Sequence, residues 1–203
     1  MGWLYMRSLA GYATPKAYLD GQFTYDRDTG GSRVLASSLV ARRTYYAAVE
    51  WITAGSGGRD VWGLVCLVRY NPRDREGLVF GYKDMSETMG PCESECPARI
   101  LDLLTATDNT YALAWRARCR ARLSERSARA AKPTPKPGDV VVLAEPILFR
   151  DGRTFSRFEA VAWPGRARSG LVYRSELGGL YRIPKLKDRV YRIEGTPGPR
   201  TRD

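Results

Sequence analysis

The sequence predicts an α+β protein with two modules: an antiparallel sheet with covering helices, followed by a small β-barrel. Three observations lead to this prediction. Residues 43–53 alternate between two sets of side chains with the period of a strand. Residues 60–70 are apolar at nearly every position, as in a central strand buried on both faces. The segment AAKPTPKPG, residues 130–138, contains three prolines, so it should end a helix and separate the modules.

The first module, residues 1–123, should begin with a short strand in GWLYM. Thr14-Pro15 predicts a helix start, because a threonine caps well and a proline at the first helical position needs no N–H. That helix would cover AYLDGQFTY. Strands at residues 33–40 and 77–82 would join the two central ones, and helices would follow at residues 98–104 and 110–126.

The last of these helices carries two patterns. An apolar stripe recurs every four residues at Tyr111, Trp115, Cys119 and Leu123. Parallel to it runs a basic row, and the arginines of this row and beside it are Arg116, Arg118, Arg120, Arg122, Arg126 and Arg129. Arginines at this spacing repel one another unless an anion lies along them. The row therefore indicates either a solvated helix face or a binding face.

Residues 124–137 would form an Arg/Pro-rich linker, and residues 138–194 the second module. Its apolar runs are short and rich in β-formers, and Asp151-Gly152 is a strong hairpin signal. A short PKLKD turn before the last run resembles the helical turn that precedes the final strand of SH3-like barrels. The module is therefore predicted to be an SH3-like β-barrel, and residues 195–203 a disordered tail.

Charge is distributed unevenly along the chain, whose formal net charge is +11. Residues 1–110 contain 12 Lys+Arg and 13 Asp+Glu, whereas residues 111–203 contain 21 and 9. A basic half beside a neutral one points to a polyanion or an acidic protein surface as partner. The cations expected to be exposed, on the helix and in turns, are Arg116, Arg118, Arg122, Arg126, Arg129, Arg150, Arg153, Arg166, Arg168, Lys185 and Lys187.

The chain contains no histidine, which excludes Ser-His-Asp and Cys-His nucleophile systems and the usual zinc hydrolase sites. Its glycine-rich stretches lack the lysine and the following helix of a phosphate-binding loop. We therefore expect a protein that is not an enzyme and that uses no cofactor and no catalytic metal.

No apolar run approaches the roughly 18 residues of a membrane span. Because MGWLYM is also too short for a signal peptide, we expect a cytoplasmic location.

Residues 80–97 are expected to form a loop that crowds carboxylates, methionines and cysteines together. Its contact residues would be Tyr82, Lys83, Asp84, Met85, Glu87 and Met89. A magnesium site built on the acids of residues 84–95 is the catalytic alternative, against an exposed acidic turn before a helix. The four cysteines Cys66, Cys92, Cys96 and Cys119 match a structural zinc site in number but not in spacing, so burial as free thiols is the default.

Several segments together carry a resemblance: GWLYM, ATPKAYLDGQFTY, RVLASS, YYAAVEW, VCLVRYNPRDREG, FGYKDMSETMGPCESECPARILDLLT and GGLYRI with the L-x-DR after it. They resemble an uncharacterised bacterial family, a domain of unknown function carried on plasmids and prophages. The resemblance spans nearly the whole chain, and its long loop motif is the specific part. Such proteins tend to be encoded beside antirestriction and conjugation genes, which implies a role in protecting incoming mobile DNA. The resemblance brings no catalytic residues.

We therefore expect a non-enzymatic anti-defence protein, of the anti-CRISPR or antirestriction type. It would bind a host defence nucleoprotein or nuclease and block its nucleic-acid path. The alternative is a DNA- or RNA-binding accessory protein of a plasmid or phage, which would contact nucleic acid directly. A metal-dependent enzyme using residues 84–95 is the third hypothesis. No membrane partner is expected, and the sequence leaves the target and the oligomeric state open.

Overall fold

A computed structural model describes residues 2–27, 30–53, 59–70, 77–163 and 170–194 of the 203-residue chain. The chain divides into two compact units, Met1–Glu125 and Arg126–Asp203, and each is described by itself. Among the described residues, no helix combines the length and the apolar character that crossing a bilayer requires.

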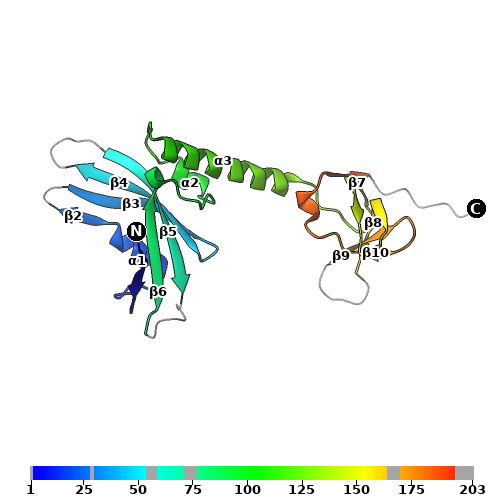
Figure 1. Ribbon diagram of the computed structural model, residues 1–203, viewed down its shortest axis with the longest axis horizontal. Coiled ribbons are helices and arrows are strands. Elements are labelled where there is room, and N and C mark those ends of the chain that lie inside the picture. The colour runs from blue at the N-terminus through cyan, green and yellow to red at the C-terminus, as the bar shows by residue number, and fades with distance from the viewer. Residues whose placement is uncertain (1, 28–29, 54–58, 71–76, 164–169, 195–203) are drawn as a thin grey trace, which may run out of the picture. The chain divides into compact units, whose positions relative to one another are not determined.

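The first unit is built on a curled antiparallel sheet (Figure 1). Its described strands are β1 (Leu4–Met6), β2 (Tyr25–Arg27), β3 (Gly30–Val40), β4 (Thr44–Thr53), β5 (Arg59–Tyr70) and β6 (Phe80–Ser86). Their order across the sheet is β1-β6-β5-β4-β3-β2, so β3 to β6 pair as sequential neighbours and β1 pairs with β6 at one edge. The two predicted central strands, β4 and β5, lie in the middle.

Both faces of this sheet are covered, which explains why β5 is apolar almost throughout. On one face, α1 (Pro15–Gln22) packs Tyr18 and Leu19 against Tyr45 of β4 and Phe80 of β6. On the other face, α2 (Ala98–Leu101) and the first half of α3 (Thr110–Ala131) pack against the alternate side chains of β4 and β5. Strand alternation therefore divides one sheet between two hydrophobic clusters.

A glycine in the middle of β5 lets α3 approach the sheet closely. A Cβ built on Gly63 would lie 2.9 Å from Cζ3 of Trp115, whose side chain is fully buried. The indole ring therefore packs directly on the strand backbone, where any larger residue would push it away.

Several expected boundaries differ from the observed ones. The first helix ends at Gln22 rather than at residue 25, and Tyr25 begins the edge strand β2. Strand β6 continues through Ser86 because its alternating residues stay paired with β5. Helix α3 continues to Ala131, so residues 124–131, assigned from the sequence to the linker, are helical. The expected tail, residues 195–203, lies outside the described residues.

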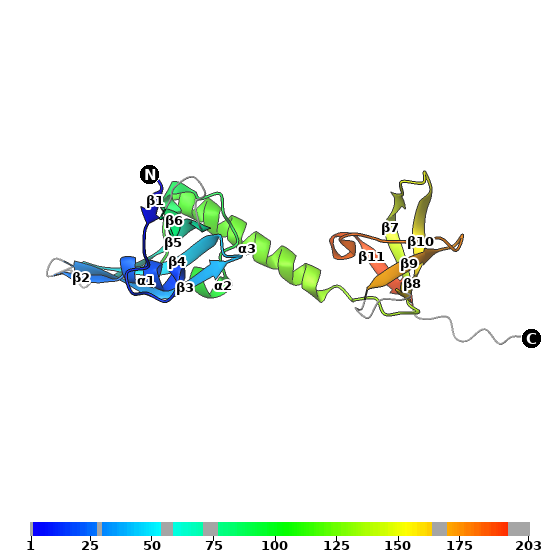
Figure 2. The same ribbon diagram turned by 90° about the horizontal axis from the view of Figure 1, so that it is seen from below.

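The second unit holds another antiparallel sheet, of order β10-β9-β8-β7-β11 in its described part (Figure 2). Its elements are β7 (Val140–Leu148), β8 (Thr154–Ala162), β9 (Leu171–Ser175), β10 (Leu180–Tyr181), a 3₁₀ turn η2 (Leu186–Asp188) and β11 (Tyr191–Glu194). The predicted hairpin turn is confirmed: Gly152 adopts φ +77°, and Phe149 and Arg153 close the turn through a 2.8 Å backbone hydrogen bond.

An aromatic cluster packs against the core of this unit. Phe149, Phe155, Phe158 and Tyr181 pack with ring centroids 4.2 to 6.3 Å apart. The described pairings leave β10 and β11 at opposite edges of the sheet. They establish a five-stranded antiparallel sheet with a 3₁₀ turn before its last strand, and the SH3-like closure stays a prediction.

We expect Gly63→Ala to lower the free energy of unfolding by about 1–3 kcal/mol, because the added methyl overpacks the contact with Trp115. Gly2→Ala is the matched control, since a Cβ at Gly2 meets no atom within 4 Å. Urea unfolding of both variants measures the difference. Equal midpoints for Gly63→Ala and Gly2→Ala would contradict the close approach of α3 to β5.

Candidate nucleic-acid interface

Helix α3 carries five of the eleven predicted cations, and its N-terminal half is fixed to the first sheet. The Oδ1 atom of Asn109 caps the helix by accepting from the N–H of Ala112 at 3.0 Å. Trp115 is fully buried, and its Nε1 donates to the carbonyl of Glu93 at 2.8 Å. The predicted stripe is confirmed except at its first position, because Tyr111 is 64% exposed and Ala112 is buried in its place.

Arg116 does not belong to the exposed row. It is 8% exposed, and its Nε and Nη2 atoms each donate to a carboxylate oxygen of Glu87 at 2.7 Å. Its Nη1 atom donates to the carbonyl of Thr105 at 2.6 Å. Glu87, which is 2% exposed, also accepts from the backbone N–H of Gly63 at 3.1 Å. The predicted cation and the predicted loop carboxylate thus neutralise each other inside the first unit.

The arginines further along the helix differ. Arg118 is exposed, and one of its Nη atoms donates to the carbonyl of Pro91 at 2.9 Å, which leaves its charge without an acid. Arg122 and Arg126 are exposed and make no ion pair within the part of the chain that the structure describes. Since they stand four residues apart, they share one helix face with Arg118.

Arg129, the last member of the row, has an acidic partner. Its Nε lies 2.9 Å from Oδ1 of Asp188, in the 3₁₀ turn η2 of the second unit. Just beyond the helix, Lys132 donates to the carbonyls of Lys187 and Arg189 at 3.0 and 2.9 Å. These residues tie the end of α3 to η2, so Arg129 contributes less free charge than the sequence suggests.

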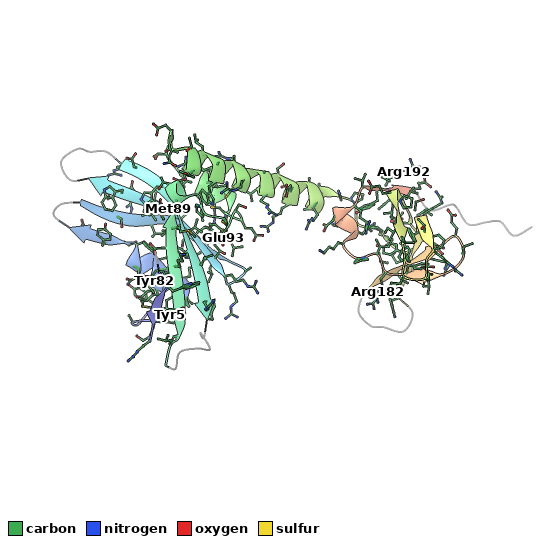
Figure 3. All side chains as sticks on the ribbon, viewed as in Figure 1. Tyr5, Tyr82, Met89, Glu93, Arg182 and Arg192 are labelled. Atoms are coloured by element: carbon green, nitrogen blue, oxygen red, sulfur yellow. The ribbon has the colours of Figure 1, made fainter. Side chains whose placement is uncertain are left out.

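The three arginines on the described strands of the second unit are all paired. Arg157 and Arg192 both contact Glu194, at 2.5 and 3.0 Å, and Arg174 lies 3.2 Å from Glu159. Arg182 instead stacks over the ring of Trp163, 4.5 Å from its centroid. Figure 3 shows Arg182 and Arg192 on opposite sides of this unit. The basic strands are therefore largely balanced by acids of their own sheet.

The turn cations are less constrained. Arg150 and Arg153 flank the β7–β8 turn and are exposed, and so is Lys185, which precedes η2 with φ +54°. Lys187 is half-buried in η2. Arg166 and Arg168 lie outside the described residues. The described turn cations thus lie in two separate turns, and they do not form a single row like the one on α3.

The predicted contact loop is mostly strand. Tyr82 is 5% exposed in the α1-side cluster, where burial raises its pKa to about 12. Lys83, Asp84 and Met85 are half-buried within β6. Of the predicted set, Met89 is the exposed member, at 50%, and Figure 3 shows it apart from Tyr82. The proposed loop contact therefore reduces to the tip of the turn at η1 (Glu87–Met89).

The acids and cysteines of this region do not gather around a common point. Among the described residues, no three His, Cys, Asp or Glu side chains lie close enough to share a metal ion. Cys66 and Cys96 are buried on opposite faces of the first sheet, and Cys119 lies with Cys96. Burial raises the pKa of all three thiols, to about 11 for Cys119. Cys92 is exposed.

The structure also brings together cations that sequence reasoning did not select. Arg42, Arg43 and Arg69 line an open groove at one end of the first sheet, together with Trp3 and Tyr70. Two sequence signals were present, the adjacent arginines Arg42-Arg43 between predicted strands and Arg69-Tyr70 at a strand end. Neither signal indicates that the β3–β4 turn and the end of β5 meet.

Comparison with known proteins gives one family match. Residues 106–186 match a family described as a domain of unknown function, DUF6927. The match covers α3 and the second unit as far as η2, and it leaves out the long motif at residues 80–105 on which the resemblance most depended. No curated protein and no solved structure gave a match. Neither the plasmid or prophage context nor an SH3-like barrel is supported by these comparisons.

We expect Arg116→Met to lower the free energy of unfolding by about 3–5 kcal/mol, because Glu87 would stay buried without its cation. The double variant Arg116→Met/Glu87→Gln should recover much of this loss, since the neutral amide can still accept from the N–H of Gly63. Denaturant unfolding of the single and double variants measures both effects. A double variant no more stable than the single one would show that the two charges act independently.

We expect iodoacetamide at mildly alkaline pH to modify only Cys92 in the native protein, since the other thiols are buried and protonated. All four should react after denaturation, and Cys92→Ser should abolish native labelling. Mass spectrometry of the alkylated chain measures both. Native labelling of Cys119 would instead mean that α3 leaves the sheet readily.

Proposed function

We propose that this chain is a non-enzymatic protein that binds a polyanion through the exposed face of α3. The observation that carries the proposal is the row Arg118, Arg122 and Arg126, which is exposed and has no acid partner within the described residues. Three guanidinium groups at helical spacing repel one another, and a phosphate backbone along the helix relieves that repulsion. Arginine is suited to this because its planar fork donates two parallel hydrogen bonds to a phosphate.

The contrast with the neighbouring arginines supports this choice. Arg157, Arg174 and Arg192 are also exposed, yet each has a glutamate of its own sheet. An exposed pair contributes only about 0–1 kcal/mol to stability, but it cancels local positive potential. The arginines of α3 that make no ion pair among the described residues therefore contribute to the positive field of this half of the chain.

We propose that in the cell this surface inhibits a host defence system, as anti-CRISPR or antirestriction proteins do. The protein would bind a host nucleoprotein or nuclease and cover its nucleic-acid path. This part rests on the resemblance stated above, while the charge distribution supports only the contact. Such an inhibitor needs surface and affinity rather than chemistry, which agrees with a chain that has no histidine.

The second candidate is a nucleic-acid-binding accessory protein of a mobile element, favoured by the same unpaired row. A metal-dependent enzyme using residues 84–95 fits less well. Glu87, the buried carboxylate of that stretch, is occupied by Arg116 and the N–H of Gly63. Its lone pairs are used for structure rather than for a ligand.

We expect the double variant Arg122→Gln/Arg126→Gln to bind duplex DNA more weakly than the native chain. The plot of log affinity against log salt should lose a slope of about two, one released counterion for each lost phosphate contact. The matched control is Arg157→Gln/Arg174→Gln, which removes the same charge from arginines that already have acids. Fluorescence anisotropy over a range of salt concentrations measures the slopes.

The outcomes separate the candidates. Equal slopes for the two double variants would remove α3 from the interface. If the native chain binds no bare duplex but is retained by an immobilised nucleoprotein nuclease, the anti-defence role is favoured. Tight binding to bare duplex with the predicted slope favours the accessory role instead.

A further inference from the structure

The groove at the end of the first sheet is a second candidate binding site, separate from α3. It has a volume of about 590 Å³ and lies where the β3–β4 turn meets the last residues of β5. Its lining includes Trp3, Arg42, Arg43, Arg69, Tyr70 and Glu93. Volumes of this size accommodate small organic ligands.

Two arginines of the groove are held against aromatic rings. The guanidinium carbon of Arg42 lies 5.1 Å from the ring centroid of Tyr70, and that of Arg69 lies 5.1 Å from the ring centroid of Trp3. Stacking fixes the plane of a guanidinium group while leaving its N–H edge available. Each stacked arginine is therefore preorganised to donate to an anion without losing side-chain freedom on binding.

The turn that presents Arg42 is conformationally unfavourable. Ala41 and Arg42 both adopt left-handed conformations, with φ of +49° and +56°, where glycine and asparagine are preferred. The N–H of Arg43 closes the turn onto Val40 at 3.0 Å, and the carbonyl of Arg43 accepts from Val68 of β5 at 2.7 Å. Non-glycine residues in this conformation cost about 1–3 kcal/mol each, and such strain is concentrated at functional sites.

The local charge of the groove is positive although the first half of the chain is neutral overall. Arg42, Arg43 and Arg69 make no ion pair with any described residue. A further cation, Lys83 of β6, lies directly opposite Leu67 of β5 in the strand register. Leu67 also lines the groove, so Lys83 is on the same face of the sheet as this lining residue. The cations thus outnumber the one acid among the described lining residues, Glu93.

Glu93 itself is unusual. Its Oε2 atom is buried and has no hydrogen-bond partner among the described residues. The backbone carbonyl of Glu93 accepts from Nε1 of Trp115 at 2.8 Å, which fixes the chain at this residue. A buried carboxylate oxygen without a donor is costly.

We propose that this groove binds a nucleotide, with its phosphate on Arg42 and Arg69 and its base beside the aromatic rings. Two features select this class over a plain anion: guanidinium edges for phosphate oxygens and flat aromatic rings for a base. The nucleotide is either free or part of a single strand, because both present the same phosphate and base.

The proposal does not depend on the function assigned to α3. The groove residues belong to the first unit, and none of them is in the helix. A duplex bound along α3 is held through its phosphates alone, whereas the groove requires an unpaired base. Failure of one site therefore leaves the other untouched.

The test uses the full chain, titrated with nucleoside monophosphates and with a single-stranded oligonucleotide of about a dozen residues. Tryptophan fluorescence reports binding, and loss of the signal in Trp3→Phe assigns it to the groove. Arg42→Asn and Arg69→Gln should each weaken binding about tenfold or more, because each removes a charge-assisted contact. Asparagine tolerates the left-handed conformation, so Arg42→Asn keeps the turn.

The control Arg174→Gln removes one charge from an arginine that already pairs with Glu159 and should leave this affinity unchanged. Unfolding midpoints of all variants confirm that the fold is intact. Binding of the strand but not of monophosphates identifies the strand as ligand, and binding of both identifies the nucleotide unit; either outcome supports the proposal. Equal affinity for inorganic pyrophosphate, or affinity unchanged by Arg42→Asn and Arg69→Gln, overturns it.

Discussion

The buried ion pair between Arg116 and Glu87 determines where the rest of the basic helix can lie. Glu87 accepts from Gly63 in the central strand, and Arg116 reaches from α3 to Glu87 and to the carbonyl of Thr105. One carboxylate and one guanidinium group thereby connect β5, η1 and α3. With Trp115 seated on Gly63, they fix the rotation of the helix about its axis. That rotation decides which arginines face the sheet and which face solvent.

Because the rotation is fixed, arginines with the same chemistry have different roles. Arg116 neutralises a buried acid, Arg118 extends to a backbone carbonyl, and Arg122 and Arg126 are left exposed. Further along, Arg129 belongs to the second unit and pairs with Asp188 of the same unit. A basic helix is thus a mixture of structural and available charges. Only the available ones contribute to the long-range positive field of the protein.

The sequence predicted the elements well where local chemistry dominates. The Thr14 cap, the alternation in β4, the apolar run of β5 and the Asp151-Gly152 turn are all short-range patterns, and the structure confirms each. The prediction from sequence was wrong where the pairing between strands determines the structure. Strand β6 extends to Ser86 because β5 offers it partners, although its own residues look like a loop. The burial of Glu87 was missed for the same reason: it depends on contacts with residues distant in sequence. An acidic residue after a strand usually faces water.

Net charge is a poor guide to binding sites for a related reason. Residues 1–110 sum to nearly zero, yet the register of β5 and the turn after β3 place three arginines around one groove. Charges separated by more than a screening length of about 8 Å act almost independently in physiological salt. A distant aspartate therefore balances the sum without reducing the potential in the groove. What matters is which side chains the sheet brings within that distance, and pairing register rather than composition determines this.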